Sequence, residues 1–448
     1  MIVRPLLASI SALALLTCAA GACGHDTDAS SSLDAGNGAD GAMVVLGPAI
    51  IVTTLAPALT NAPAAKASAT LAAYRLDEGP WQPLAPSAEG TYRIPFAVKH
   101  WAVALVCASD DSALSTVFVH RRTSATTTLD ATLEDFCTPP APAPEFALDG
   151  NLLHVPATTA WLDFGYARDS RGDALPTAGT TVPYEVVGIA PGTWDLTFGV
   201  RDDSFGSLTH VVILRGKTVT GDQKLDVDFT GAFTPGTRPM LLRGIAQGDS
   251  VTPQVLYGVG GPFGIEVGPQ DVPANQSDVT IAYATVPESV QIASDRYRGM
   301  LSAVQDRRDG SRDIAFDFHQ AVDVDLTFLP DVPAPTVKML SSGSQPVLLE
   351  TRFPVLANAV RHEVRALVSL NRRTQHAWQA TFDAASVAGA TEVVDTMPDL
   401  SVLPGWNSQW ALAAGQQISV AATGFEAPKG LGDGTAQRSV TKVTTLSP

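Results

Sequence analysis

The chain of 448 residues is poor in charged side chains, which make up only 17% of it, and basic residues are the scarcer kind. There are 29 Lys and Arg against 45 Asp and Glu, giving a formal net charge of −16 at pH 7. A surface of this sign repels phosphate backbones, so we expect no nucleic-acid partner. Low charge together with 45% hydrophobic residues excludes a disordered chain and predicts packed cores.

Linear catalytic and cofactor signatures are missing as well. The sequence contains no Gly-x-Ser-x-Gly, His-Glu-x-x-His, phosphate-binding loop, dinucleotide-binding glycine pattern or EF-hand spacing. Its eight histidines are scattered without the spacing of metal ligands. Gly248-Asp249-Ser250-Val251 resembles the nucleophile block of GDSL-type esterases, but no Asp-x-x-His follows it, and we interpret it as a polar turn. We therefore expect no enzyme, no cofactor and no metal.

Helical periodicity is scarce, and strand patterns fill most of the chain. Short β-branched or aromatic runs such as "WAVALVCA" and "HVVILR" are separated by Gly, Pro, Asp and Asn. The 37 Gly and 32 Pro fit frequent turns. Even residues 359–370, which have some helical spacing, carry alternating apolar residues and are interpreted as a strand. The sequence predicts an all-β protein.

Only four cysteines occur, and two of them lie near the N-terminus. Arg4 precedes an apolar run from Leu6 to Leu16, and small residues follow up to Cys23. This is the layout of a secretory signal. The run is too short for a transmembrane helix, which needs about 20 apolar residues.

Ala20-Gly21-Ala22-Cys23 is similar to the lipobox of bacterial lipoproteins. The resemblance implies a signal peptide over residues 1–22, a lipid on Cys23 and a membrane as partner through that lipid. It also implies a cell-envelope location at the outer membrane or surface, because Gly24 replaces the Asp that retains such proteins at the inner membrane. Residues 23–47 are predicted to form a flexible acidic tether. Lipidation of Cys18 and ordinary secretion without a lipid stay open as alternatives.

An internal repeat organises the rest of the chain. Residues 100–122 and 193–216 share a leading Trp, an apolar run, an Asp pair, a returning β-branched run and a final Arg. An Asp-Phe pair follows each of them, and the landmarks are offset by 92 to 94 residues throughout. Weaker copies lie at 297–319 and 418–443. We interpret the repeated piece as a three-strand meander with an acidic hairpin turn.

A unit of about 95 residues with about seven short strands resembles immunoglobulin-like and fibronectin-III-like β sandwiches. Proline-rich breaks at 138–146, 234–239 and 330–337 separate the units. The sequence thus predicts tandem β-sandwich domains, immunoglobulin-like, over residues 48–138, 146–233, 238–332 and 336–448. The resemblance rests on pattern alone and assigns no ligand-binding residue.

The two remaining cysteines, Cys107 and Cys137, are predicted to form a disulfide. An exported chain folds in an oxidising compartment, and the repeat places the two residues on strands that flank each other or face across a sandwich. Two buried reduced thiols are the alternative.

Three further groups have a functional interpretation beside a structural one. The turn residues Asp110, Asp111, Asp202 and Asp203 are calcium candidates, although Asp also forms turns on its own. Trp406 and Trp410 form either a sugar-binding platform or part of a core. A basic cluster either meets polyanions or is simply solvated, and it consists of Arg361, His362, Arg365, Arg372, Arg373 and His376.

Two hypotheses of function follow. The first is a non-enzymatic, membrane-anchored surface lipoprotein, a stalk of β sandwiches for adhesion, assembly or ligand display, with a protein or polysaccharide as partner. The alternative is an envelope-anchored hydrolase that acts on polysaccharide or ester substrates through dispersed carboxylates.

Overall fold

The structure is a computed structural model, and it describes residues 49–446 apart from 57–63, 97–98, 138–143, 176–178, 205, 269–271, 273–275, 306–308, 342–345, 372–373 and 413–414. The chain divides into two units, Met1–Leu46 and Gly47–Pro448, and every described residue belongs to the second. The predicted signal peptide, Cys18, Cys23 and the tether lie outside the described residues. The described chain consists of strands and a few short 3₁₀ helices, which confirms the all-β sandwich prediction.

The first group of strands, module 1, forms two sheets with the orders β4-β5-β1-β8 and β3-β2-β6-β7. Its elements are β1 (Ala49–Leu55), β2 (Leu71–Leu76), β3 (Gln82–Pro83), β4 (Pro86–Ala88), β5 (Thr91–Pro95), β6 (His100–Ala108), β7 (Leu114–Thr123), β8 (Thr128–Thr132) and the 3₁₀ helix η1 (Asp135–Cys137).

Module 2 has the sheets β12-β9-β15, with β16 also on β9, and β11-β10-β13-β14. Its elements are β9 (Phe146–Leu153), β10 (Trp161–Tyr166), β11 (Asp169–Ala174), β12 (Thr181–Ile189), β13 (Gly192–Arg201), β14 (His210–Val219), β15 (Gln223–Lys224), β16 (Val227–Asp228) and η2 (Phe229–Gly231).

Module 3 has the sheets β20-β17-β23 and β19-β18-β21-β22. Its elements are β17 (Gly236–Arg243), β18 (Ser250–Gly258), β19 (Gly264–Glu266), β20 (Asp278–Thr285), η3 (Glu288–Val290), β21 (Arg296–Val304), β22 (Gly310–Phe318) and β23 (Val324–Thr327).

Module 4 has the sheets β24-β25-β28 and β31-β29-β26-β27, with β30 on β31. Its elements are β24 (Thr336–Met339), β25 (Leu349–Pro354), β26 (Ala359–Asn371), β27 (Thr374–Asp383), η4 (Ala385–Val387), β28 (Glu392–Thr396), η5 (Ser408–Trp410), β29 (Ile418–Glu426), β30 (Lys429–Leu431) and β31 (Gly434–Leu446).

The repeated sequence forms a hairpin in each module, namely β6–β7, β13–β14, β21–β22 and β29–β31. Its leading tryptophan closes the base of the hairpin in module 1. Trp101 is 2% exposed, and its indole N–H donates to the carbonyl oxygens of Thr123 (3.1 Å) and Thr126 (2.9 Å). In module 2 the indole N–H of Trp194 donates to the carbonyl of Ala190 at 2.8 Å.

The prediction that each repeat forms a three-strand meander is wrong. After each hairpin of modules 1 to 3 the next strand crosses to the opposite sheet and pairs in parallel with the first strand of its module, as β8 does with β1, β15 and β16 with β9, and β23 with β17. The crossing lets the last strand cover the core from the far side, which a meander cannot do. Module 4 lacks this parallel pair among its described strands, and β28 pairs antiparallel with β25.

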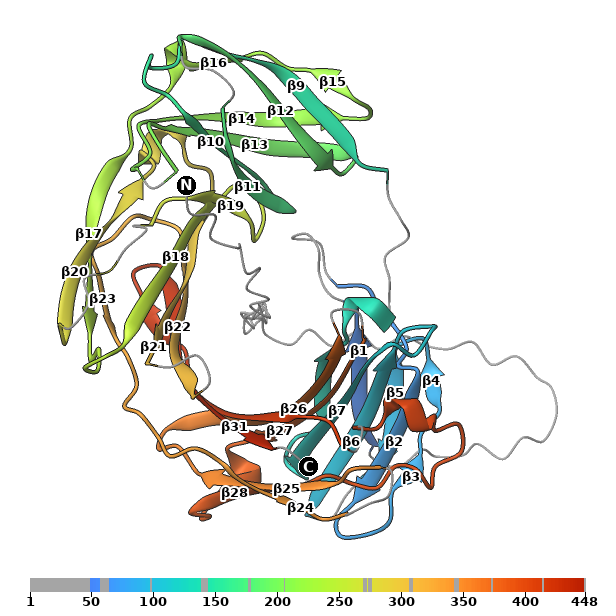
Figure 1. The fold of residues 1–448 in the computed structure, drawn as a ribbon. Coiled ribbons are helices and arrows are strands. Elements are labelled where there is room, and N and C mark those ends of the chain that lie inside the picture. The colour runs from blue at the N-terminus through green and yellow to red at the C-terminus, as the bar shows by residue number, and fades with distance from the viewer. Residues whose placement is uncertain are drawn as a thin grey trace, which may run out of the picture. The chain divides into compact units, whose positions relative to one another are not determined.

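Strand pairing joins modules 1, 3 and 4 into a 13-stranded sheet. β22 of module 3 pairs antiparallel with β31 of module 4 over Gly310–Asp317, and β27 of module 4 pairs in parallel with β7 of module 1 over Gln375–Phe382. Figure 1 labels β22, β31, β26, β27 and β7 along this sheet, in which β29 lies between β31 and β26. Modules 1, 3 and 4 are therefore joined by the backbone hydrogen bonds of strand pairing as well as by linkers.

The β7–β27 junction also has a core of its own. Ala104, Val106 and Val119 of module 1 belong to the same buried cluster as Trp378 and Leu403 of module 4. The opposite face of β6 packs into the core of module 1, so that all its residues from Trp101 to Ala108 are buried. A strand that is buried on both faces needs a continuous apolar run, and "WAVALVCA" is one.

Modules 1 and 2 use the same arginine of the repeat to contact the module that covers them. Arg121 donates to a carboxylate oxygen of Asp395 in module 4 at 2.8 Å, and Arg215 donates to Asp295 in module 3 at 2.9 Å. Both aspartates are almost completely buried. A buried carboxylate is stable only when it is paired and hydrogen-bonded, so each contact fixes the two modules in one register.

Candidate functional site

The covered face of module 2 meets module 3 along a seam where glycines let two backbones touch. A Cβ atom on Gly165 of β10 would lie 2.6 Å from the carbonyl carbon of Gly264 in β19, and one on Gly261 would lie 2.3 Å from the Cα of Ala167. No side chain fits at these positions, so the β10 strand and the β18–β19 hairpin pack directly against each other.

Arg201 joins the two sides of this seam. Its Nε donates to Asp163, Nη1 donates to the carbonyl of Gly206 (2.5 Å), and Nη2 donates to the carbonyl of Glu266 in module 3 (2.6 Å). The arginine is 2% exposed and its donors are directed to separate acceptors. It therefore holds Asp163 in place from one side.

Beside Arg201 the seam opens into a pocket of about 340 Å³, which we call the seam pocket. This volume lies within the range of roughly 300–1,000 Å³ that is typical of small-ligand sites. Polar side chains predominate on its walls, together with one tryptophan. The lining residues are Trp161, Asp163, Ser170, Arg171, Gly172, Ser204, Gln254, Leu256, Gly264, Ile265 and Glu266.

Trp161 is held by hydrogen bonding and by a gap in the neighbouring strand. Its indole N–H donates to Oδ1 of Asp163 at 3.2 Å. A Cβ on Gly172 of β11 would lie 2.8 Å from Nε1 of Trp161 and 3.0 Å from Oδ1 of Asp163. Gly172 thus leaves the space that the indole edge and the carboxylate occupy.

Burial raises the pKa of Asp163, and the neighbouring charge of Arg201 opposes this shift. One carboxylate oxygen accepts from Arg201 and the other from Trp161. With both oxygens engaged, Asp163 positions its neighbours and is poorly placed to exchange a proton with a ligand.

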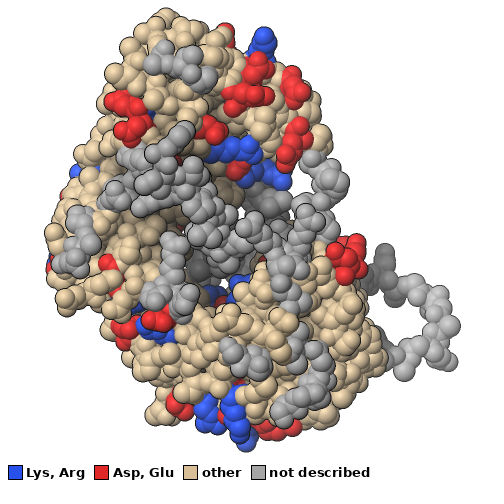
Figure 2. All heavy atoms as spheres, in the orientation of Figure 1, with Lys and Arg blue, Asp and Glu red and all other residues tan. Residues whose placement is uncertain are grey.

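Charged groups elsewhere also lie close to opposite charges. On the face drawn in Figure 2, uncharged residues predominate, and basic and acidic residues lie next to one another at several places. Ion pairs such as Arg243–Asp325 and Arg296–Asp317 follow this pattern. The seam pocket is similar, since Nε of Arg171 donates to Asp169 at 2.6 Å.

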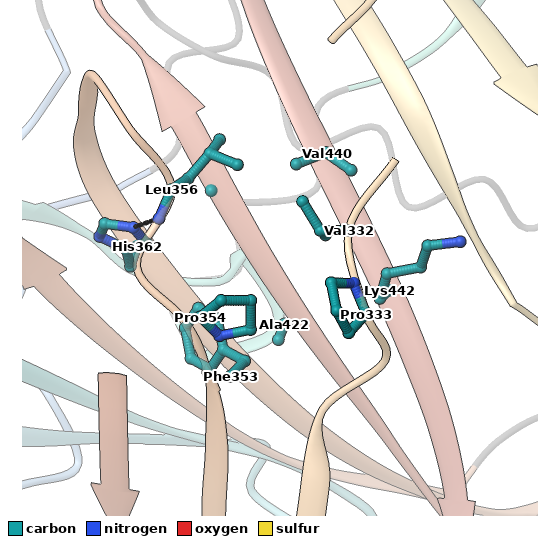
Figure 3. A pocket seen from close by; sticks show the side chains of 10 residues that line it. Val332, Pro333, Phe353, Pro354, Leu356, His362, Ala422, Val440 and Lys442 are labelled. Atoms are coloured by element: carbon teal, nitrogen blue, oxygen red, sulfur yellow. Dashed lines mark hydrogen bonds between the residues drawn. The ribbon is translucent and has the colours of Figure 1, made fainter. Parts of the chain in front are cut away.

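A second cavity lies in module 4, between Phe353, Leu356, His362 and Val440 (Figure 3). It measures about 10 Å³, which is space for one water molecule at most. Nε2 of His362 accepts from the backbone N–H of Leu356 at 3.1 Å, and burial lowers the pKa of the ring. This cavity is a packing feature around a neutral histidine.

The predicted basic cluster does not form one patch in the described residues. Arg361 and Arg365 lie on one face of β26, whereas His362 is buried on the other face. The guanidinium of Arg361 stacks on Phe425 at 4.0 Å from the ring centre, and His376 is buried against the hydroxyl of Ser115 at 2.8 Å. Arg372 and Arg373 lie outside the described residues.

The acidic turns make the contacts of ordinary turn formers. Oδ1 of Asp111 accepts from the hydroxyl of Ser109 (2.7 Å) and the N–H of Ala113 (3.0 Å), and these bonds lower its pKa. Asp202 accepts from the hydroxyl of Thr158 at 2.7 Å, whereas Asp110 and Asp203 lie in the same two turns. Within the described ranges no three His, Cys, Asp or Glu residues are grouped to hold a metal ion.

Trp406 and Trp410 pack into the core that module 4 shares with module 1. Their rings meet edge to face with centres 5.6 Å apart, and Trp410 is 8% exposed. They therefore form no open platform, in agreement with the core interpretation.

The Gly-Asp-Ser segment at 248–250 forms a turn held by an ion pair. Asp249 is buried, pairs with Arg312 and accepts from the N–H of Ala246 at 2.9 Å. Arg312 in turn donates to the carbonyl oxygens of Gly244 and Leu329. The segment supports the start of β18, in agreement with its interpretation as a turn.

Cys107 and Cys137 are brought together as predicted, with Cα atoms 5.2 Å apart and a disulfide between them. Cys107 lies in β6 and Cys137 ends η1, after the chain has crossed to the other sheet. Of the two geometries considered from the sequence, the bridge across the sandwich is the one that occurs.

The seam pocket was missed by the sequence interpretation. Trp161 and Asp163 belong to module 2 and Gln254 to module 3, and together they match no linear motif. The available signal was the set of glycines inside strand patterns, at 165, 172 and 264, which indicates close backbone approach.

Comparison with known proteins adds no family: no family model and no curated protein matches this sequence. None of the helices in the described part of the chain has the length and apolarity needed to cross a membrane.

Proposed function

We propose that the protein is a non-enzymatic surface lipoprotein, anchored in the cell envelope by a lipid on Cys23, whose sandwiches form one connected scaffold for adhesion, assembly or ligand display. The observation that carries the proposal is the 13-stranded sheet, because it joins modules 1, 3 and 4 through backbone hydrogen bonds. A scaffold that presents a ligand under load gains from such connections, whereas domains on linkers swing independently.

The contacts between modules support the same proposal. Asp295 and Asp395 are buried carboxylates, and each is paired with an arginine from another module. Asp163, the pocket carboxylate with a raised pKa, is likewise engaged at both oxygens. These carboxylates stabilise the contacts between modules, which is a structural role.

The anchor is tested by replacing Cys23→Ser and, as the matched control, Cys18→Ser in the full chain. We expect Cys23→Ser to move the protein from the membrane to the soluble fraction and to remove the lipid mass from the N-terminal peptide. Cys18→Ser should stay with the membrane. Membrane retention of Cys23→Ser, or release of Cys18→Ser alone, would contradict the assignment.

The non-enzymatic part is tested by incubating the purified chain with ester and oligosaccharide substrates. We expect no turnover above background. Turnover that disappears when a single Asp or Ser is replaced, in a variant that still folds, would favour the hydrolase instead.

A further inference from the structure

We propose that the seam pocket binds a neutral sugar unit of an oligosaccharide, with the apolar face of the sugar against Trp161 and its hydroxyls toward the polar walls. The inference deepens the proposed display function by naming a ligand class, and it rests on that function only for the expectation that the bound sugar is not cleaved.

The aromatic wall suits a sugar because it is oriented before any ligand arrives. Trp161 is only partly buried, its N–H is bonded to Asp163, and Asp163 is held by Arg201. A ring fixed by two successive contacts loses little freedom on binding, which favours affinity. Its flat apolar surface matches the C–H face of a sugar ring.

The polar walls suit hydroxyl groups. Gln254 supplies an amide, which both donates and accepts, and Ser170 and Ser204 supply hydroxyls with the same double capacity. Sugar hydroxyls need partners of both kinds. An ionic ligand is less suited, because Arg171 is paired with Asp169 and Asp163 with Arg201.

Comparison of the two strongest copies of the repeat shows that the fold does not require this polar arrangement. The register of β2 with β6 and of β10 with β13 makes Leu71 and Ala108 of module 1 equivalent to Asp163 and Arg201 of module 2. In module 1 this covered face is apolar and packs against module 4. Replacing an apolar pair by a buried ion pair costs desolvation, so the charged pair does something that an apolar pair cannot do. Arg201 bonds the carbonyl of Glu266 in module 3, and through Asp163 the pair also positions Trp161 beside the pocket.

The test uses the full chain in detergent with three neutral probes, namely chitotetraose, cellotetraose and maltotetraose, by isothermal titration calorimetry and tryptophan fluorescence. We expect at least one probe to bind with a dissociation constant below about 1 mM. Trp161→Ala should weaken that binding at least about tenfold, as expected for loss of a buried aromatic contact. Trp81→Ala is the matched control, because Trp81 stacks on Arg75 in module 1 and should leave binding unchanged.

Gln254→Ala tests the pocket without a folding defect. Gln254 lies on the face of β18 that points away from the core of module 3, so its replacement leaves that core intact. We expect binding of the same probe to weaken several-fold with an unchanged unfolding midpoint. A third variant, Asp163→Leu with Arg201→Ala, copies module 1 and should weaken binding by releasing Trp161.

The absence of binding for all three probes overturns the inference, as does unchanged binding by Trp161→Ala or Gln254→Ala. Cleavage of a bound probe supports the pocket but overturns the non-enzymatic function. The release of Cys23→Ser from membranes depends neither on probe binding nor on probe cleavage. A failure of the proposed anchor is therefore distinguished from a failure of the pocket.

Discussion

Removal of the Cys107–Cys137 bridge measures how strongly module 1 is coupled to the rest of the chain. The bridge closes a loop across a sequence separation of 30 residues. By the chain-entropy relation such a closure stabilises the folded state by about 3.6 kcal/mol. We expect Cys107→Ala with Cys137→Ala to lose approximately this amount.

The shift in melting temperature depends on how much of the chain unfolds together. Unfolding entropy is about 2.1 cal/mol/K per residue, so the same loss lowers Tm by about 4 °C for a unit of about 400 residues and by about 19 °C for a module of about 90 residues. β7 is paired with β27 and the two modules share a core. We therefore expect the small shift and a single transition.

Differential scanning calorimetry of the oxidised wild type and of the double variant checks this, with reductant added to each. Reductant should lower the midpoint of the wild type and leave the variant unchanged. A separate early transition displaced by about 20 °C would refute the coupling through β7 and β27. No difference between wild type and variant would refute the stabilising role of the bridge.

Three further predictions concern the seam, the partly buried His120 and the turn at 248–250. Gly261→Ala places a Cβ 2.3 Å from the Cα of Ala167 and should loosen the seam, which hydrogen exchange would show as faster exchange in β10 and β19. Gly430→Ala is the control, because a Cβ there has nothing within 4 Å and should leave exchange in β10 and β19 unchanged. Equal exchange rates in the two variants would contradict the close packing at the seam. Burial, and then the charges of Arg122 and Arg361, lower the pKa of His120 from its ordinary 6.5 to about 3. As the pH falls, the unfolded state therefore binds the proton before the folded state does, and the free energy of unfolding decreases between about pH 6.5 and pH 3. His120→Gln should remove that part of the slope, about 1–2 kcal/mol between pH 7.5 and 5 in urea unfolding, and an unchanged slope would show that the ring is not held neutral. Asp249→Ala leaves Arg312 buried without its carboxylate partner and should lower the free energy of unfolding by about 3–5 kcal/mol. Ser250→Ala should change it by no more than about 0.5 kcal/mol. An ester hydrolysis that is lost with Ser250→Ala would contradict the assignment of this segment as a turn.

Local patterns predicted the hairpins because their signals lie within a single copy of the repeat. The tryptophan, the acidic turn and the returning β-branched strand fix β6–β7 and β13–β14 without help from distant residues. The disulfide followed from the same alignment. The destination of β8 was predicted wrongly, because the five residues of "TLDAT" do not specify which sheet they join. Pairing with β1 is decided by the core that the crossing covers.

Contacts between modules were beyond the sequence for a related reason. Arg121 is visible as a landmark of the repeat, but its partner Asp395 lies 274 positions further along the chain. The seam pocket combines Trp161 of β10 with Gln254 of β18, and neither residue has a pattern of its own. The sequence did show one sign of these contacts, because the continuous apolar run in β6 indicates a strand that is buried on both faces.

The parallel pairing of β7 with β27 sets a problem of timing during synthesis. β7 is made about 260 residues before the strand that covers its edge. Until module 4 arrives, module 1 exposes an unpaired strand edge beside Ala104, Val106 and Val119, which is a surface prone to association with other chains. Contacts of such long sequence separation also form slowly. Newly made chains are therefore expected to depend on a holding chaperone until their last strands have been synthesised. C-terminal truncations should aggregate even though the first module is complete.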